Sequence, residues 1–248
     1  MIVTIVGAGR MARGLATRAL AGGHRVRLVD RSRAKAAELA EELRRRARNG
    51  AGEVCGSDAI AVEDADLVIL AVPYPRGRDI AVDYGTALTG SVLVDVSNPS
   101  DSLGAPGPAR PREEPGACAA RTGSPGAPGP SGPSGPSGAD VLPAGTSAAE
   151  QIAAEAPPGA PVVKAFNTNT ADTLLTGRVA GRPLDVLIAG DEGDAKRSVA
   201  HLASSCGLRP LDVGPLCRAR ELEGLRLLHR AATERLGCGP FSAVTILS

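Results

Sequence analysis

The sequence predicts an α/β fold with a doubly wound, mostly parallel sheet, a small C-terminal α/β part and a disordered Gly/Pro-rich insertion. Three observations predict it. Short apolar runs alternate with segments of helical periodicity over residues 1–98. A glycine-rich turn follows the first apolar run. The alternation stops at residue 101, where Gly and Pro crowd together, and it resumes at Thr146.

In the first part of the chain, four apolar runs predict strands that are covered on both faces, as in a parallel sheet. These runs are Ile2–Val6, Val26–Val29, Leu67–Val72 and Val92–Val96. Between the first three runs lie two predicted helices, residues 11–22 and the segment from Ala36 onward. Strands that alternate with helices in this way are typical of a parallel sheet with right-handed crossovers.

Residues 101–145 have no periodic apolar face, and glycines recur at every third position between Gly123 and Gly138. The spacing is that of collagen, but so short a repeat without partner chains is not expected to form a triple helix. We expect a flexible segment biased toward polyproline II. The predicted organisation is therefore a dinucleotide-binding domain at 1–100, an insertion at 101–145, and a continuation of the sheet with a substrate-side part at 146–248.

The α/β pattern after the insertion predicts six further elements. A short helix is expected to begin with Thr146 and Glu150 and to end at Ala156, before Pro157-Pro158. The other predicted elements are strands at 162–165, 184–189 and 210–213, and helices at 195–206 and 216–236. In the last helix, Arg220 and Glu223 are expected to pair, or Arg220 to touch an anionic substrate.

Composition excludes several functional classes. The chain has 248 residues, 43% of them hydrophobic and 22% charged, with a net charge of +1. This balance argues against a disordered protein and against the basic surface of a nucleic-acid binder. Aromatic residues at 2% are too few for base-stacking platforms. No apolar run reaches the length of a membrane span, and the five cysteines lack metal-site spacing. We expect a cytoplasmic protein with no membrane, nucleic-acid or metal partner.

The strongest chemical signal is the segment Gly7-Ala8-Gly9-Arg10-Met11-Ala12, which fits G-x-G-x-x-A between a predicted strand and a predicted helix. The first glycine permits a tight turn, the second lets the backbone approach a pyrophosphate, and Ala12 permits close packing of helix and strand. The N–H groups at the helix start would face the phosphates. This is the fingerprint of a Rossmann-type dinucleotide site.

The residues after the second strand leave the choice of dinucleotide open. Asp30 lies 21 positions after Gly9, where a carboxylate accepts hydrogen bonds from the ribose hydroxyls of NAD. Arg31, Arg33 and Lys35 follow at once and are suited to grip the 2′-phosphate of NADP. These residues therefore do not decide between NAD and NADP.

The chain resembles the F420-dependent NADP oxidoreductases, which pass hydride between NADP(H) and the deazaflavin coenzyme F420. Besides the fingerprint, the resemblance rests on five segments: 94–99 (VDVSNP), 162–168 (VVKAFNT), 189–191 (AGD), 207–216 (GLRPLDVGPL) and 219–223 (ARELE). The wider family includes the cytosolic domain of membrane ferric reductases, and pyrroline carboxylate reductases are more distant relatives. The resemblance implies a Rossmann domain, a smaller C-terminal part with the second substrate in the cleft between them, and a homodimer.

The resemblance also implies roles for individual residues. The pyrophosphate would lie on Gly7, Gly9, Arg10, Met11 and Ala12. Arg31 and Lys35 match positions that bind the 2′-phosphate, whereas Asp30 replaces a small neutral residue of NADP-specific members, so that NAD stays open. Around the reacting rings, Val72 and Pro73 would edge the nicotinamide and the Ala165 backbone would hold its carboxamide. The substrate cleft would be lined by Asn98, Pro99, Gly214, Pro215 and Leu216.

The sequence contains no clear candidate for a general acid. This is compatible with hydride transfer to a deazaflavin. Asn167 is the candidate polar group beside the nicotinamide, and its alternative role is to cap a turn or helix. The leading hypothesis is an NAD(P)-dependent oxidoreductase that moves hydride between NADP(H) and coenzyme F420. The alternatives are a reductase of a small imine or carbonyl compound and a non-catalytic NADP(H)-binding sensor.

Overall fold

The computed structural model describes residues 1–46, 54–56, 62–99, 142–143, 145–239 and 241–247. The predicted insertion at 101–145 lies outside this set, apart from residues 142, 143 and 145.

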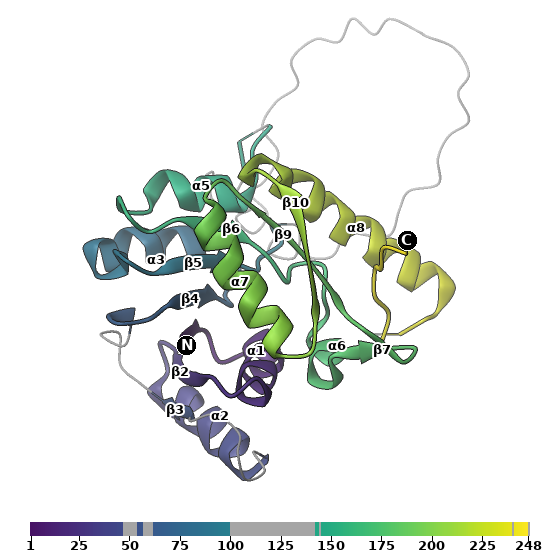
Figure 1. The fold of residues 1–248 in the computed structure, drawn as a ribbon, viewed down its shortest axis with the longest axis horizontal. Helices are drawn as coiled ribbons and strands as arrows, with labels where there is room; N and C mark the ends of the chain where they lie inside the picture. The colour runs from purple at the N-terminus through teal and green to yellow at the C-terminus, as the bar shows by residue number, and fades with distance from the viewer. Residues whose placement is uncertain (47–53, 57–61, 100–141, 144, 240, 248) are drawn as a thin grey trace, which may run out of the picture.

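The described residues form an eight-stranded sheet in the order β10-β9-β6-β5-β4-β1-β2-β3 (Figure 1). The strands are β1 (Ile2–Val6), β2 (Arg25–Val29), β3 (Val54–Gly56), β4 (Leu67–Leu70), β5 (Val92–Asp95), β6 (Val162–Lys164), β9 (Asp185–Gly190) and β10 (Arg209–Gly214). Neighbouring strands are parallel except β6 and β9, which pair antiparallel. The predicted doubly wound, mostly parallel sheet is therefore confirmed.

Helices cover both faces of the sheet. On one face, α1 (Arg10–Ala21), α2 (Arg33–Arg46) and α7 (Gly193–Ser205) contribute to the larger apolar core. On the other face, α3 (Arg76–Tyr84), the 3-10 helix η2 (Gly85–Leu88) and α5 (Ala148–Glu155) form the second core. All four residues of β4 are buried, which explains its unbroken run of apolar side chains.

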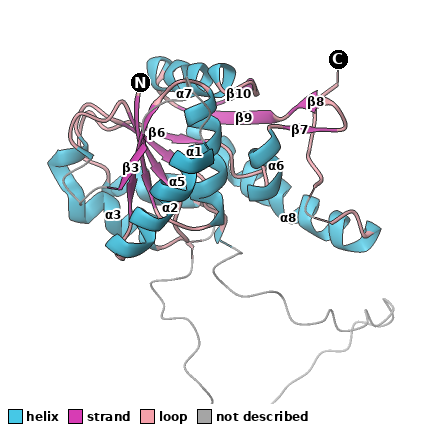
Figure 2. Cartoon of the chain, turned by 90° about the horizontal axis from the view of Figure 1, so that it is seen from below, coloured by secondary structure: helices cyan, strands magenta, loops and turns pink. Residues whose placement is uncertain are grey.

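A smaller group of elements lies at one end of the sheet. It comprises α6 (Ala171–Thr176), the hairpin of β7 (Arg178–Val179) and β8 (Arg182–Pro183), and α8 (Ala219–Leu236), which follows the 3-10 turn η4 (Leu216–Arg218) (Figure 2). Residues 241–247 return to the start of β9, where the Asp185 carboxylate accepts hydrogen bonds from the Ile246 N–H at 2.8 Å and the Thr245 hydroxyl at 3.0 Å. None of the described helices is both long and apolar enough to cross a membrane.

The helices expected from Ala36, Thr146, residue 195 and Leu216 each start two or three residues away from the predicted position. The helix expected from Thr146 has Ser147 as its N-cap, because Ser147 and Glu150 close a capping box: the Ser147 hydroxyl accepts the Glu150 N–H, and the Glu150 carboxylate accepts the Ser147 N–H. The helix expected from Leu216 opens instead with η4, in which the Arg218 N–H bonds to the Pro215 carbonyl. No element bounds were predicted for β3, α3, η2, α6 or the β7–β8 hairpin.

Candidate active site

A cavity of about 840 Å³ opens at the carboxyl ends of the parallel strands. It lies where β1 and β4 meet, the point at which the chain reverses its direction of travel across the sheet. Open α/β sheets bind ligands in the crevice at this switch point. The lining comes from the segments after β1, β4, β5 and β6, and from α6, α8 and the tail.

The turn after β1 has a conformation that only glycine accepts at its first position. Gly7 has a φ of +115°, and a Cβ placed on it would lie 2.4 Å from the carbonyl oxygen of Ala71, at the end of β4. The Gly7 N–H also donates to the Val29 carbonyl at 2.7 Å. The turn is thus held between β2 and β4 by backbone contacts.

The second fingerprint glycine leaves open space at the start of α1. A Cβ on Gly9 would meet no atom within 4 Å. Gly9 is the N-cap of α1, no side chain caps this helix end, and its first turn has no acidic residue. The helix N-terminus therefore offers backbone N–H groups and the positive end of its dipole to an anion. The residues fit the pyrophosphate of a dinucleotide.

Asp30 takes part in forming this turn. Its carboxylate accepts a hydrogen bond from the Ala8 N–H at 2.9 Å and another from the Ser32 N–H at 2.9 Å. The side chain that would bind an NAD ribose therefore already links the fingerprint loop to the start of α2. Arg31 and Lys35 lie exposed beside it.

Asn98 and Asn167 form a buried amide pair on the cavity wall. The Asn167 Nδ2 donates to Asn98 Oδ1 at 3.0 Å and to the Leu222 carbonyl at 3.0 Å, while Asn98 Nδ2 donates to the Asn167 carbonyl at 3.1 Å. Asn167 Oδ1 has no hydrogen-bond partner among the described residues. These bonds tie the ends of β5 and β6 to α8.

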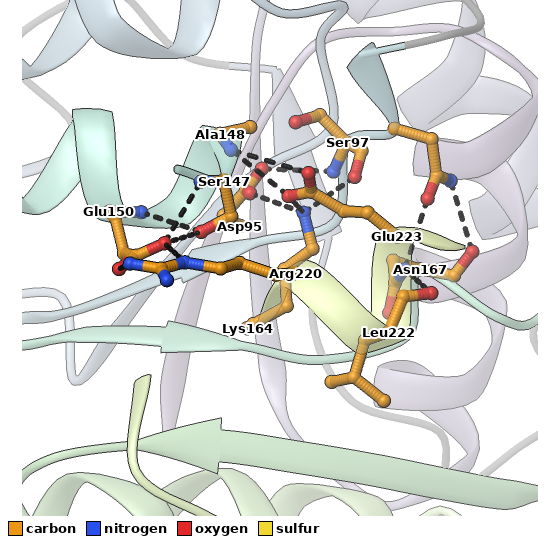
Figure 3. Close-up of polar contacts among 11 residues, drawn as sticks. Asp95, Ser97, Ser147, Ala148, Glu150, Lys164, Asn167, Arg220, Leu222 and Glu223 are labelled. Atoms are coloured by element: carbon orange, nitrogen blue, oxygen red, sulfur yellow. Dashed lines mark hydrogen bonds and ion pairs between the residues drawn. The ribbon is translucent and has the colours of Figure 1, made fainter. Parts of the chain in front are cut away.

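Behind this wall lies a buried cluster of charges that sequence reasoning did not find (Figure 3). The Nζ of Lys164 lies 2.7 Å from Asp95 Oδ2, 2.7 Å from Glu223 Oε1 and 2.7 Å from the carbonyl oxygen of Ser97. Glu223 also accepts the Ala148 N–H, at the start of α5, at 3.1 Å. Desolvation raises the pKa of Glu223, and the attraction of Lys164 opposes that rise.

The cluster ties α8 to β5, β6 and α5, and Lys164 holds the carbonyl of Ser97, a residue of the cavity wall. The predicted Arg220–Glu223 pair is wrong, because Glu223 turns inward to Lys164. Arg220 instead pairs with Glu150 at 2.6 Å, and its hydrogen bond is the main cause that lowers the pKa of Glu150.

Seven of the predicted site residues line the cavity together: Gly9, Arg10, Met11, Val72, Pro73, Asn98 and Asn167. Three lie in or behind the wall, since Gly7 forms the turn while Ala12 and Ala165 are fully buried in the core. Asp30, Arg31, Lys35 and Pro99 are not among the lining residues.

The structure does not place Gly214, Pro215 and Leu216 on this cavity, where the substrate cleft was expected. β10 is the edge strand, and β9 separates it from β6. The Leu216 N–H donates to Asp191 Oδ1 at 2.8 Å, and the Leu216 side chain packs into the second core. Leu216 and Asp191 line a separate cavity of about 290 Å³.

Several lining residues were not predicted, among them Asp172, Arg226 and Arg230. One pattern in the sequence could have indicated the two arginines. Leu222, Arg226 and Arg230 follow one another at intervals of four residues, which places them on one face of a helix. Asp172 gave no such signal, because its helix α6 has only six residues.

Comparisons with known proteins show the family to which this chain belongs. A family described as "NADP oxidoreductase coenzyme F420-dependent" matches residues 2–99. The F420-dependent NADP reductase of Methanothermobacter marburgensis is 30% identical over 90% of this chain and 87% of its own. The metalloreductase STEAP3 of Rattus norvegicus is 29% identical over 91% of this chain, which spans only 36% of that protein.

Among solved structures, a proposed F420-dependent NADP reductase from Arthrobacter sp. FB24 matches with a TM-score of 0.69 and 24% identity, over 99% of both chains. That likeness supports the fold. The match to the Methanothermobacter reductase extends through both the fingerprint half and the C-terminal half of the chain. The chain therefore belongs to the F420-dependent NADP oxidoreductase family and is an NAD(P)-dependent oxidoreductase.

Proposed function

We propose that the protein transfers hydride between NADP(H) and coenzyme F420. The observation that carries the proposal is one continuous cavity that runs from the fingerprint turn to α8. A cavity of about 840 Å³ is large enough for the reacting ends of two ligands to meet. The named activity of the Methanothermobacter relative supports the choice of partners.

The nucleotide would occupy the fingerprint side of the cavity. The open backbone at Gly9 and the uncapped start of α1 would hold its pyrophosphate. Val72 and Pro73, directly after β4, would edge the nicotinamide, as the apolar part of the lining.

NADP(H) supplies a hydride and the deazaflavin accepts it, so the chain's own residues have to hold the two rings in contact and exclude water. Asn98 and Asn167 are suited to this because their amides are fixed by mutual hydrogen bonds and by the Leu222 carbonyl. Both side chains are buried, so the wall they form is rigid.

Two acidic side chains lie in the described part of the cavity lining, Asp172 and Glu234. The two carboxylates are each paired with an arginine: Asp172 with Arg10 at 2.6 Å, and Glu234 with Arg230 at 3.0 Å. Both carboxylates are therefore engaged by arginines of this chain. The choice of F420 over an imine or carbonyl compound rests on the named activity of the Methanothermobacter relative.

We propose NADP(H) rather than NAD(H) because both oxygens of Asp30 already accept backbone N–H groups. Arg31→Ala is expected to weaken NADP binding about 10-fold and to leave NAD binding unchanged, because only NADP carries the 2′-phosphate. Isothermal titration of both nucleotides measures this. Arg25→Ala, on β2, serves as a control for loss of charge.

Equal loss of affinity for NADP and NAD in Arg31→Ala would overturn the phosphate role. Asp30→Ser is expected to weaken binding of both nucleotides, since the Ala8 and Ser32 N–H groups lose their shared acceptor. A gain in NADP affinity in that variant would contradict this positioning role of Asp30.

The function itself is tested by mixing purified protein, NADPH and oxidised F420 and following both chromophores. The expected result is loss of NADPH and of oxidised F420 in equal amounts. Binding of NADP(H) without turnover of F420 or of any imine or carbonyl compound would favour the sensor alternative. The homodimer implied by the resemblance is tested on the same sample by light scattering.

A further inference from the structure

The positive and negative charges in the described lining of the cavity are unequal in number, with three arginines and two acidic residues. They are Arg10, Arg226, Arg230, Asp172 and Glu234. Asp172 pairs with Arg10 at 2.6 Å and Glu234 with Arg230 at 3.0 Å. Arg226 has no hydrogen-bond or ion-pair partner in the part of the chain that the structure describes.

Arg226 is placed to meet a ligand rather than bulk water. It lies on α8, one helical turn before Arg230, and its side chain is half-buried at the cavity wall. A half-buried guanidinium that lacks an anionic partner has lost part of its hydration without compensation. An anion bound in the cavity would provide that compensation.

The neighbouring wall adds further polar groups. Thr233 and Ser242 line the same cavity, with their hydroxyl oxygens 3.1 Å apart, and the Ser242 Oγ lies 3.0 Å from His229 Nε2. Burial lowers the pKa of His229, and the positive charge of Arg226 lowers it further. The end of the cavity formed by α8 and the tail is therefore positive and polar, in contrast to the apolar side at Val72 and Pro73.

We propose that Arg226, with Arg230 beside it, is the subsite for an anionic group of the second substrate, a phosphate or a carboxylate. This rests on the proposed function, because it assumes that the fingerprint side of the cavity holds NADP(H). The side chain of coenzyme F420 carries a phosphodiester and carboxylates, whereas its riboflavin-like core compound carries neither group. Arg226 then selects the charged coenzyme over the bare deazaflavin.

The test compares wild type, Arg226→Gln and Arg235→Gln with F420 and with the core deazaflavin as acceptors. Arg235 provides the matched control because it is exposed on the same helix and does not line the cavity. For Arg226→Gln we expect the KM for F420 to rise about 10-fold, as for loss of one charged hydrogen bond. The KM for the core compound and the Kd for NADPH are expected to stay unchanged.

Equal KM changes for both acceptors, or an effect confined to the Kd for NADPH, would overturn the proposal. If wild type reduces neither acceptor, the hydride-transfer proposal fails, and the anion subsite is tested separately. Protein saturated with NADP is then titrated with inorganic pyrophosphate. Binding that is about 10-fold weaker in Arg226→Gln than in wild type and Arg235→Gln supports the subsite, and equal binding in all three overturns it.

Discussion

Replacement of Gly7 by alanine is expected to weaken dinucleotide binding at least about 100-fold. The new Cβ would lie 2.4 Å from the Ala71 carbonyl oxygen, and the φ of +115° is strained for any residue with a side chain. The fingerprint turn would have to move away from β4, and loss of one or two charge-assisted hydrogen bonds to the pyrophosphate corresponds to about 100-fold in affinity. Titration with NADP measures the loss of affinity, and a thermal melt measures the effect of the strained turn on stability.

Gly9→Ala is expected to change nucleotide binding without changing the stability of the fold. Its Cβ would meet no atom within 4 Å, so the variant is expected to melt at the wild-type temperature. The methyl group would nevertheless occupy the space where the backbone meets the pyrophosphate, and NADP affinity is expected to fall. Wild-type affinity in Gly9→Ala would contradict the assignment of this turn to the nucleotide.

Lys164→Met is expected to destabilise the fold by about 3–5 kcal/mol, because it leaves the buried Asp95 and Glu223 without their cation. For a chain of this size, that corresponds to a fall in Tm on the order of 10 °C. The matched control is Lys196→Met, which removes the ion pair with the exposed Asp212. That change is expected to cost at most about 1 kcal/mol.

The deficit of Lys164→Met is expected to depend on pH. Removal of Lys164 takes away the attraction that opposes the raised pKa of Glu223. An acid whose pKa is higher in the folded than in the unfolded state loses stability as pH rises from the unfolded pKa to the folded one. The deficit should therefore be smallest in acid and grow toward neutral pH. Denaturant unfolding at several pH values measures this, and equal deficits for Lys164→Met and Lys196→Met would contradict the cluster's role.

Most of the strands were predictable because they are short runs of apolar residues that the sheet buries on both faces. β4 is the clearest case, with all four residues buried. By contrast β3 has three residues, and α6 has six and is defined by a capping box between Thr170 and Thr173. Elements this short lack the length over which a period can be recognised.

Residue spacing predicted the site only where it is local in sequence, whereas Val72, Pro73 and Asn98 of the cavity lining were expected from the family resemblance. The fingerprint turn lies within six consecutive residues, and its spacing alone states the backbone geometry. The Lys164 cluster joins residues 69 and 59 positions away in the chain. No local pattern reports such a contact, and Lys164 at the end of a strand reads as an ordinary exposed lysine. The residues of α8 that line the cavity were not predicted for the same reason.

Single-turnover transfer of deuterium from NADPH labelled at the nicotinamide C4 tests the hydride-transfer proposal most directly. With wild-type protein and oxidised F420, the label from the transferred position is expected in the reduced deazaflavin, one atom for each NADPH consumed. Gly9→Ala should show the same transfer with a higher NADPH requirement. Consumption of NADPH without deuterium in the deazaflavin, or no consumption by protein that binds NADPH, would contradict hydride transfer between these two partners.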